Sequence, residues 1–218
     1  MLVVGSITVA YLLGSIPFGL LIAKARGVDL RKTGSGNIGA TNVTRVLGKK
    51  LGVVCFILDA CKGLLPSVWT LLLVEPRFLA AGHSELMFHW LWLATGCVAI
   101  LGHVFPVYIG FRGGKGVATS FGVALGIWPY FTCSALISIS LWAWVAMKSR
   151  YVSLASVIAS MAFPVFLLGS IAFVPPWTLE ALWPLLIIGI AIPAVVAMRH
   201  QRNIKRIMTR SEDKIGTP

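Results

Sequence analysis

A glycine-rich polar segment follows the first hydrophobic stretch of the chain. It reads Thr33-Gly34-Ser35-Gly36-Asn37-Ile38-Gly39-Ala40-Thr41-Asn42, and Arg45 lies just beyond it. The glycines let the backbone approach a ligand closely, while the hydroxyl, amide and guanidinium groups supply hydrogen-bond donors. This combination is typical of a loop that binds an anion such as phosphate. A flexible inter-helix loop has a similar composition of turn residues and is the plainer interpretation.

A second candidate site reads GHVFPVYIGFRGGKG and runs from Gly102 to Gly116. Glycines ahead of a helix expose backbone N–H groups at its positive end, which suits a phosphate. The segment is not a P-loop, because Ile109 stands where the first glycine of that motif belongs and Gly116 where its hydroxyl belongs. His103 is a candidate general base, although a lone histidine at a helix end is more often an interfacial side chain.

Two further polar segments occur near the C-terminus. Ser153 ends the segment Lys148-Ser149-Arg150-Tyr151-Val152-Ser153, and His200 and Asn203 lie in the basic segment 199–206. At helical spacing His200 and Asn203 share one face, so both are predicted to turn toward a pocket. The cations around them are interpreted as a basic anchor for the last helix.

Asp59 and Lys62 are charged residues inside a hydrophobic run. Their i, i+3 spacing predicts that they pair, which lowers the cost of burying each charge. Ionisable residues within a membrane are functional candidates, but a pair that satisfies itself is more simply a structural feature.

The composition that surrounds these segments is that of a membrane protein. The chain is 57% hydrophobic and 12% charged, with a mean hydropathy of +0.87, whereas roughly a quarter of the residues in soluble domains are charged. Residues 1–23 carry no charge, which predicts a first membrane helix rather than a cleaved signal peptide. The apolar runs are 1–23, 51–74, 86–107, 117–131, 132–147, 152–174 and 181–198.

The distribution of cations decides how the runs cross the membrane. The runs 117–131 and 132–147 are together too long for one ordinary span, and Gly126 and Pro129 supply a turn between them. With a helix on each side of that turn, every lysine and arginine except Lys62 and Arg77 lies on one side. The positive-inside rule therefore predicts an all-α integral membrane protein with seven transmembrane helices, an extracytoplasmic N-terminus and a cytoplasmic C-terminus.

The net charge of +12 follows from this arrangement and suits anionic lipid, so we expect no nucleic-acid partner. Residues 1–208 are predicted to form one seven-helix domain, and residues 209–218 a short polar tail. The four cysteines and the few carboxylates show no metal-ligand spacing, so neither a metal nor a cofactor is expected.

Four segments share their order and spacing with a known family. They are Ser35-Gly36-Asn37-x-Gly39-Ala40-Thr41-Asn42, Gly102-His103-x-Phe105-Pro106 with Phe111-Arg112-Gly113-Gly114-Lys115-Gly116, Tyr151-Val152-Ser153, and His200-x-x-Asn203-Ile204. Together they resemble the bacterial acyl-phosphate:glycerol-3-phosphate acyltransferases over nearly the whole chain. The resemblance implies a seven-helix bundle in the bacterial cytoplasmic (inner) membrane, with its active site facing the cytoplasm.

The reaction that the resemblance implies moves a fatty acyl group from acyl phosphate to the 1-hydroxyl of glycerol 3-phosphate. Its products are lysophosphatidic acid and inorganic phosphate, in the first acylation step of phospholipid synthesis. The implied partners are these two substrates and membrane lipid, with neither acyl-CoA nor acyl carrier protein required. No histidine of the chain is followed by aspartate five positions later, so the H-x4-D signature of the thioester-using acyltransferases is missing.

The motifs and the resemblance together predict two groups of site residues. The predicted catalytic residues are His103, Lys115, Arg45 and Asn37. The predicted substrate-binding residues are Ser35, Gly36, Asn42, Gly113, Gly114, Ser153, His200 and Asn203. Either His103 or a phosphate oxygen of the donor takes the proton of the acceptor hydroxyl, and the sequence does not assign each cation to a phosphate.

Two other classes of protein compete with this interpretation. A transporter for a phosphorylated metabolite would place its polar residues near the membrane midplane, often in two related halves, whereas here they gather at one predicted face. A structural membrane protein with a basic surface accounts for the charge but not for two glycine-rich loops that carry Asn, Ser and His.

Overall fold

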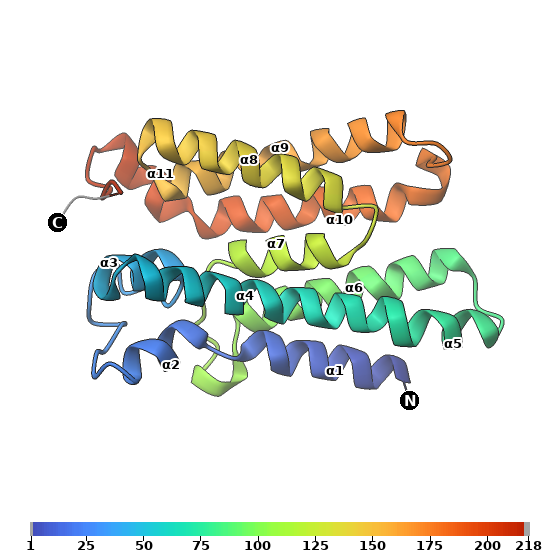
Figure 1. Ribbon diagram of the computed structural model, residues 1–218, viewed down its shortest axis with the longest axis horizontal. Helices are drawn as coiled ribbons and strands as arrows, with labels where there is room; N and C mark the ends of the chain where they lie inside the picture. Colours follow the sequence, from blue (N-terminus) through green and yellow to red (C-terminus); the bar gives the residue numbers. More distant parts are fainter. Residues whose placement is uncertain (1, 216–218) are drawn as a thin grey trace. The chain divides into compact units, whose positions relative to one another are not determined.

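The computed structural model describes residues 2–215, so Met1 and residues 216–218 of the predicted tail lie outside the described residues. All regular structure in residues 2–215 is helical (Figure 1). The chain forms two compact units, an N-terminal unit, Met1–Ile127, and a C-terminal unit, Trp128–Pro218.

The N-terminal unit carries both glycine-rich segments. Its helices are α1 (Leu2–Ser15), α2 (Phe18–Lys24), α3 (Ala40–Leu47), α4 (Lys49–Trp69), the π-helical turn η1 (Thr70–Val74), α5 (Glu75–Ala80), α6 (Glu85–Val104), the 3-10 turn η2 (Val107–Ile109) and α7 (Val117–Gly126).

Proline and capping residues account for several of these helix ends. Pro17, which has no backbone N–H, separates α1 from α2. At the start of α6 the Ser84 hydroxyl accepts a hydrogen bond from the Met87 N–H, as expected of an N-cap serine. The same helix ends at Val104, shortly before Pro106, because the residue that precedes a proline avoids helical angles.

Close packing of α4 against α7 places the second glycine-rich segment. A Cβ atom on Gly122 of α7 would collide with the Ala60 carbonyl of α4, and one on Gly63 of α4 would collide with the Thr119 carbonyl of α7. Small residues of this kind let membrane helices approach each other closely. The start of α7, directly after Gly116, is thereby fixed against α4.

The C-terminal unit consists of three long helices and one short one. They are α8 (Thr132–Ser149), α9 (Val152–Phe173), α10 (Leu179–Arg199) and α11 (Gln201–Met208). Helix α9 packs against both α8 and α10, and Ser134 of α8 hydrogen-bonds Ser170 of α9. Helix α11 ends at Met208, where the predicted polar tail begins.

Within residues 2–215, five helical stretches are long and apolar enough to cross a membrane. They are Leu2–Lys24, Lys49–Ala80, Glu85–Ile109, Val152–Phe173 and Leu179–Arg199. Five of the predicted spans correspond to these stretches. The predicted break near Gly126 and Pro129 is also confirmed, since α7 ends at Gly126 and α8 begins at Thr132.

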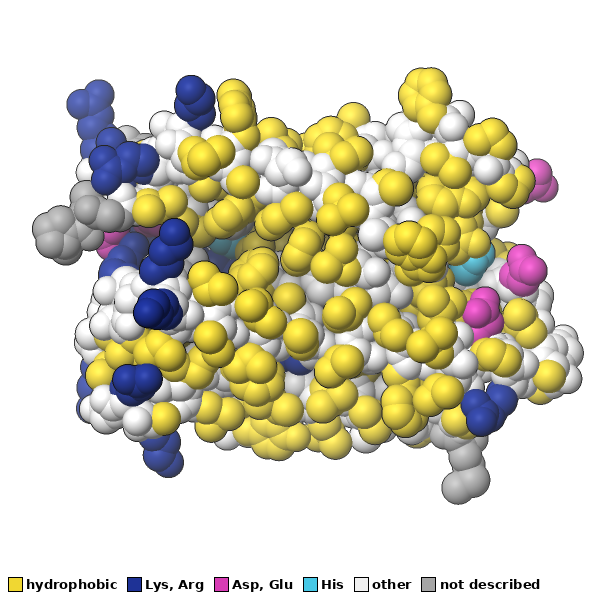
Figure 2. Space-filling model, viewed as in Figure 1, with side chains coloured by type: hydrophobic (Ala, Val, Ile, Leu, Met, Phe, Trp, Pro, Cys, Tyr) yellow, Lys and Arg dark blue, Asp and Glu magenta, His cyan; other side chains and the backbone are white. Residues whose placement is uncertain are grey.

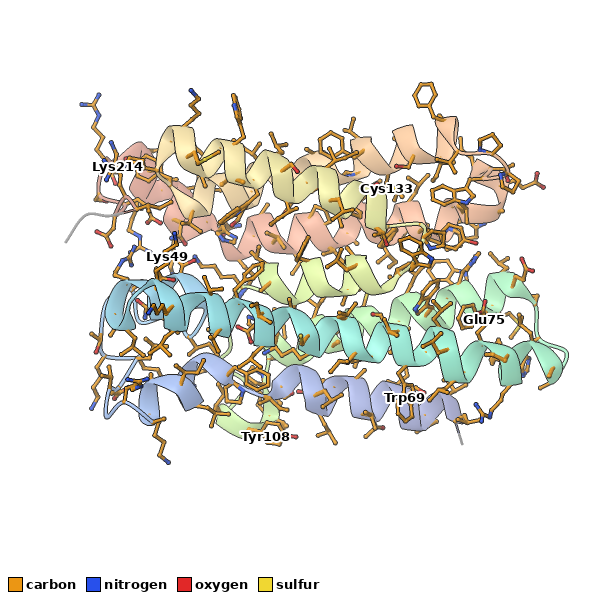
Figure 3. The ribbon with its side chains drawn as sticks, in the orientation of Figure 1. Lys49, Trp69, Glu75, Tyr108, Cys133 and Lys214 are labelled. Atoms are coloured by element: carbon orange, nitrogen blue, oxygen red, sulfur yellow. The ribbon has the colours of Figure 1, made fainter. Side chains whose placement is uncertain are left out.

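The surface of the N-terminal unit agrees with a membrane environment. Hydrophobic side chains cover its flank in Figure 2, and large side chains such as Ile57, Leu65 and Leu72 are more than half exposed. The lysines and arginines of this unit that are visible in Figure 2 gather mainly at the end that carries α3. Lys49 lies at this end and Glu75 lies toward the other (Figure 3).

Candidate active site

Asn42 organises the first glycine-rich segment from inside. Its side-chain Nδ2 donates to the carbonyls of Leu30, Thr33 and Asn37 at 3.2, 3.1 and 2.8 Å. Its Oδ1 accepts a hydrogen bond from the Ser35 N–H at 2.8 Å. Since the side chain is only 1% exposed, these bonds give it a loop-forming role. Its predicted contact with substrate stays a prediction.

The last part of this segment is helical, which corrects the prediction of a loop over residues 33–42. Helix α3 begins at Ala40, so Asn42 and Arg45 lie on its first and second turns. The Asn37 Oδ1 accepts a hydrogen bond from the Gly39 N–H at 2.9 Å, which shapes the turn before the helix. Ser35 and Arg45 are exposed, so their side chains can reach a ligand.

Gly113 and Gly114, whose N–H groups are predicted to donate to phosphate, donate them in the structure to carbonyls at the end of helix α6. The Gly113 N–H donates to the Val104 carbonyl and the Gly114 N–H to the His103 carbonyl, each at 3.1 Å. The last carbonyls of a helix have no partner within the helix, and these two N–H groups satisfy that need at the end of α6. Substrate contact by Gly113 and Gly114 stays a prediction, but these donors serve the fold.

His103 lies directly beneath the loop that Gly113 and Gly114 form. Its side chain is 4% exposed, and a Cβ atom on Gly114 would collide with the Nε2 atom of the imidazole. Only glycine at position 114 therefore lets the loop rest on this ring. Lys115 follows directly and is half-buried.

Arg31 joins the two glycine-rich segments within the N-terminal unit. Its Nη2 atom donates to the carbonyls of Ile109 and Arg112, at 3.3 and 3.2 Å. The structure thus ties the loop that contains Ser35 and Asn37 to the loop that leads to Lys115. No sequence pattern marks out Arg31, which resembles any other cation of the predicted cytoplasmic face.

The predicted pairing of Asp59 with Lys62 on α4 is confirmed. The Lys62 Nζ lies 2.8 Å from the Asp59 Oδ1 and donates to the Ile16 carbonyl, also at 2.8 Å. His103 is a third member of this group, since its Nδ1 lies 3.7 Å from the same Asp59 oxygen. This contact with a predicted catalytic residue was not anticipated from the sequence.

In the C-terminal unit Glu212 brings two predicted substrate-binding residues together. Its Oε1 atom accepts hydrogen bonds from the Ser153 hydroxyl at 2.9 Å and from the Asn203 amide at 2.6 Å. Its Oε2 atom lies 3.1 Å from the Nε of Arg206. Sequence reasoning missed Glu212, because it follows the last helix in a segment with the composition of a polar tail.

His200 is the third predicted substrate-binding residue of this unit. It is buried, and its Nδ1 lies 2.8 Å from the Val196 carbonyl. It stands between α10 and α11, one turn before Asn203. The tail itself is tied to Arg150, the residue that follows α8, since the Arg150 guanidinium donates to the Ile215 carbonyl and the Ile215 N–H donates to the Arg150 carbonyl.

Within residues 2–215, no group of three His, Cys, Asp or Glu side chains is arranged to hold a metal ion.

The helices and loops define an integral membrane protein whose glycine-rich polar loops meet at one end of its N-terminal unit. The chain belongs to the glycerol-3-phosphate acyltransferase family, which matches residues 4–210.

Individual relatives cover nearly all of the chain. It is 44% identical to a glycerol-3-phosphate acyltransferase of Aquifex aeolicus, over 94% of this chain and 95% of the relative. It is 45% identical to one of Geotalea daltonii, over 94% and 93%. Among solved structures, it is similar to the glycerol 3-phosphate form of PlsY (YgiH), an integral membrane glycerol 3-phosphate acyltransferase. That match has 40% identity and a TM-score of 0.82, and it covers 100% of this chain and 97% of that one. The lysophosphatidic acid form of PlsY matches with a TM-score of 0.80.

Proposed function

We propose that this protein transfers a fatty acyl group from acyl phosphate to the 1-hydroxyl of glycerol 3-phosphate. The products are lysophosphatidic acid and inorganic phosphate, and the reaction is the first acylation step of phospholipid synthesis. Membership of the family supports the acceptor, and the forms of PlsY solved with glycerol 3-phosphate and with lysophosphatidic acid support the acceptor and the lipid product. With acyl phosphate as the donor, the proposed reaction requires neither acyl-CoA nor acyl carrier protein.

The chemistry of the donor defines what the protein has to supply. Acyl phosphate is a mixed anhydride, so its phosphate leaves readily once the acceptor oxygen attacks the carbonyl carbon. A new ester C–O bond forms, the bond between the carbonyl carbon and the phosphate oxygen breaks, and the hydroxyl proton moves to a base. The protein therefore has to bind two anions, align the hydroxyl and stabilise the departing phosphate.

The observation that carries this proposal is the link that Arg31 makes between the two glycine-rich loops. We assign phosphate binding at these loops to Ser35, Gly36 and Asn37. The side chains of Arg45 and Lys115 supply the positive charge. Since the N–H groups of Gly113 and Gly114 bond to α6, the Lys115 side chain is the anion ligand that we assign to the second loop.

We assign His103 to orienting or deprotonating the acceptor hydroxyl, with a phosphate oxygen of the donor as the alternative base. Replacing His103 with alanine should lower kcat by roughly 10²–10⁴-fold if the imidazole is the general base. A loss of only a few-fold at saturating substrates would assign the proton to the donor phosphate instead. Ser153, His200 and Asn203 of the C-terminal unit are assigned to substrate binding.

The proposal includes the location of the protein. We place seven helices in the bacterial cytoplasmic (inner) membrane, with the N-terminus outside and the glycine-rich loops and the C-terminus in the cytoplasm. The gathering of cations at the α3 end of the N-terminal unit supports this orientation (Figure 2). Glycerol 3-phosphate would then enter from the cytoplasm, while the acyl chain of the donor stays in the bilayer.

The deciding experiment measures phosphate release from palmitoyl phosphate by the purified protein in detergent, with and without glycerol 3-phosphate. We expect release that depends on the acceptor, with one lysophosphatidic acid per phosphate by mass spectrometry. A detergent solution has no compartments, so a transporter would show no such reaction. An inactive but well-folded preparation that moves glycerol 3-phosphate into liposomes would replace the enzyme proposal with transport.

A further inference from the structure

Three ionisable side chains meet inside the N-terminal unit, within stretches long and apolar enough to span a membrane. Asp59 and Lys62 lie on α4 and His103 on α6, and their exposed fractions are 2%, 4% and 4%. A charge that is buried away from water is costly unless it has partners of opposite charge or hydrogen-bonding groups. The arrangement of the partners therefore indicates what each member of the group does.

Lys62 has a structural explanation. Its Nζ pairs with the Asp59 Oδ1 and donates to the Ile16 carbonyl, at the break between α1 and α2. The same atom lies 5.8 Å from the centre of the Phe18 ring, within reach of a cation–π interaction. These contacts join α4 to the α1–α2 break and neutralise the aspartate.

Asp59 has a second neighbour that the ion pair does not explain. The Nδ1 of His103 lies 3.7 Å from the Asp59 Oδ1, and the thiol of Cys55 donates to Oδ2 at 3.7 Å. The distance to Nδ1 is slightly longer than a hydrogen bond, but such contacts often tighten when substrate binds. The carboxylate thus faces one nitrogen of the imidazole from inside the N-terminal unit.

The other nitrogen of the same ring faces the predicted catalytic loop. The Nε2 of His103 is the atom that a Cβ on Gly114 would meet first, and Lys115 is the next residue. The imidazole therefore stands between a buried carboxylate on α4 and the glycine loop that precedes α7. A carboxylate beside Nδ1 favours the tautomer with its proton on Nδ1, which leaves the Nε2 lone pair on the loop side.

We propose that Asp59 is a positioning residue for His103, holding the imidazole with Nε2 toward the Gly113–Lys115 loop, while Lys62 keeps the carboxylate neutralised. The kinetic part of this inference rests on the proposed acyl transfer. The geometric part does not, because it concerns the orientation and protonation of one ring.

The kinetic test uses the pair Asp59→Asn and Lys62→Met, which removes both charges together and so leaves no unpaired buried ion. We expect the double variant to fold, with kcat about 10–100-fold lower, a loss of the size seen when the partner that orients a metal-bound histidine is removed. The KM for glycerol 3-phosphate should change by less than about 3-fold, because no assigned phosphate ligand is altered.

The same pair of substitutions is then made in a His103→Gln protein. If Asp59 acts through His103, these substitutions cause no further loss there, because the shared partner is already absent. A purely structural ion pair would lower kcat by the same factor in both backgrounds. Equal losses would therefore overturn the proposal.

A measurement that is independent of activity uses protein with ¹⁵N-labelled histidine in detergent micelles. The imidazole signals of His103 are those that the His103→Gln variant lacks. We expect the paired substitution to shift them toward the other tautomer and to leave the signals of His83, His89 and His200 unchanged. Unchanged His103 signals would refute the positioning contact. A clear shift in a protein that has no transferase activity would refute the proposed function and uphold the contact.

Discussion

At the scale of single residues, Glu212 accepts hydrogen bonds from two predicted substrate-binding residues, Ser153 and Asn203. Its replacement should therefore weaken substrate binding by these residues. Glu212→Gln replaces a charged acceptor of the Ser153 and Asn203 donors with a neutral amide. A hydrogen bond to a charged group contributes about 1.5–3 kcal/mol, so we expect kcat/KM to fall by about 10-fold or more. Steady-state phosphate release measures this effect.

The matched control for that substitution is Glu180→Gln. Glu180 is an exposed acid at the start of α10, and none of the predicted site residues lies in that turn. Its replacement should leave kcat/KM within about 2-fold of the parent. Equal effects of the two substitutions would show that Glu212 acts only through net charge.

Single residues also show what the sequence could not reveal about the site. Composition predicts that amides and glycine N–H groups gather in two loops. It does not show which of these donors form hydrogen bonds within the protein and which can bind a substrate. The amide of Asn42 bonds three carbonyls of its own loop, and the N–H groups of Gly113 and Gly114 close the end of α6. Glu212 was missed because it lies after the last helix, in a segment with the composition of a polar tail, and its contact with Ser153 joins residues 59 positions apart.

At the scale of elements, the link between the two glycine-rich loops depends on Arg31. Arg31→Gln shortens the side chain and removes the charge that reaches the carbonyls of Ile109 and Arg112. The loops would then lose their common support, and we expect the KM for glycerol 3-phosphate to rise by roughly 10-fold, since misplaced binding groups weaken alignment. Initial rates over a range of acceptor concentrations measure this change.

Lys32→Gln is the control for that experiment, because it removes a cation from the next position. Lys32 makes an exposed ion pair with Asp29 at 3.6 Å, and such surface pairs contribute about 0–1 kcal/mol. Its replacement should leave KM nearly unchanged. If both substitutions raise KM equally, the loops respond to local charge and not to the Arg31 link.

The packing of α4 against α7 provides a prediction about stability. Gly122→Ala adds a methyl group where the Ala60 carbonyl already stands, and overpacking of this kind costs about 1–3 kcal/mol. Gly5→Ala on α1 is the control, since a Cβ there meets nothing within 4 Å. Thermal unfolding in detergent should show a lower Tm for the first variant only, and equal Tm values would contradict the close contact.

The long apolar helices could be predicted because length and hydropathy define them. Five predicted spans correspond to stretches that are long and apolar enough to cross a membrane. The start of helix α3, residues 40–42, was predicted to belong to a loop, because the eight residues of the helix, ATNVTRVL, mix polar and apolar types and form no apolar run. The π-helical turn Thr70–Val74 has no pattern of its own, since tertiary packing decides such local departures from the α-helix.

At the scale of the whole molecule, the proposed orientation in the membrane makes a prediction about the two ends of one helical stretch. Lys49–Ala80 spans 32 residues, or about 48 Å as helix, which exceeds the roughly 30 Å of hydrocarbon in a bilayer. Lys49 and Arg77, near its two ends, should therefore face opposite compartments. We expect the Lys49 end to face the cytoplasm, because the lysines and arginines of the N-terminal unit that are visible in Figure 2 gather mainly at this end.

Single cysteines test this orientation in a variant from which Cys55, Cys61, Cys97 and Cys133 have been removed. We expect a membrane-impermeant maleimide to label Lys49→Cys in inside-out vesicles and Arg77→Cys in right-side-out vesicles. The reverse pattern would show that the protein has the opposite orientation. The glycine-rich loops would then lie outside the cell, where the proposed cytoplasmic substrate could not reach them. Labelling of both cysteines from one side would instead show that this stretch does not cross the membrane, which would also remove the basis for counting seven spans.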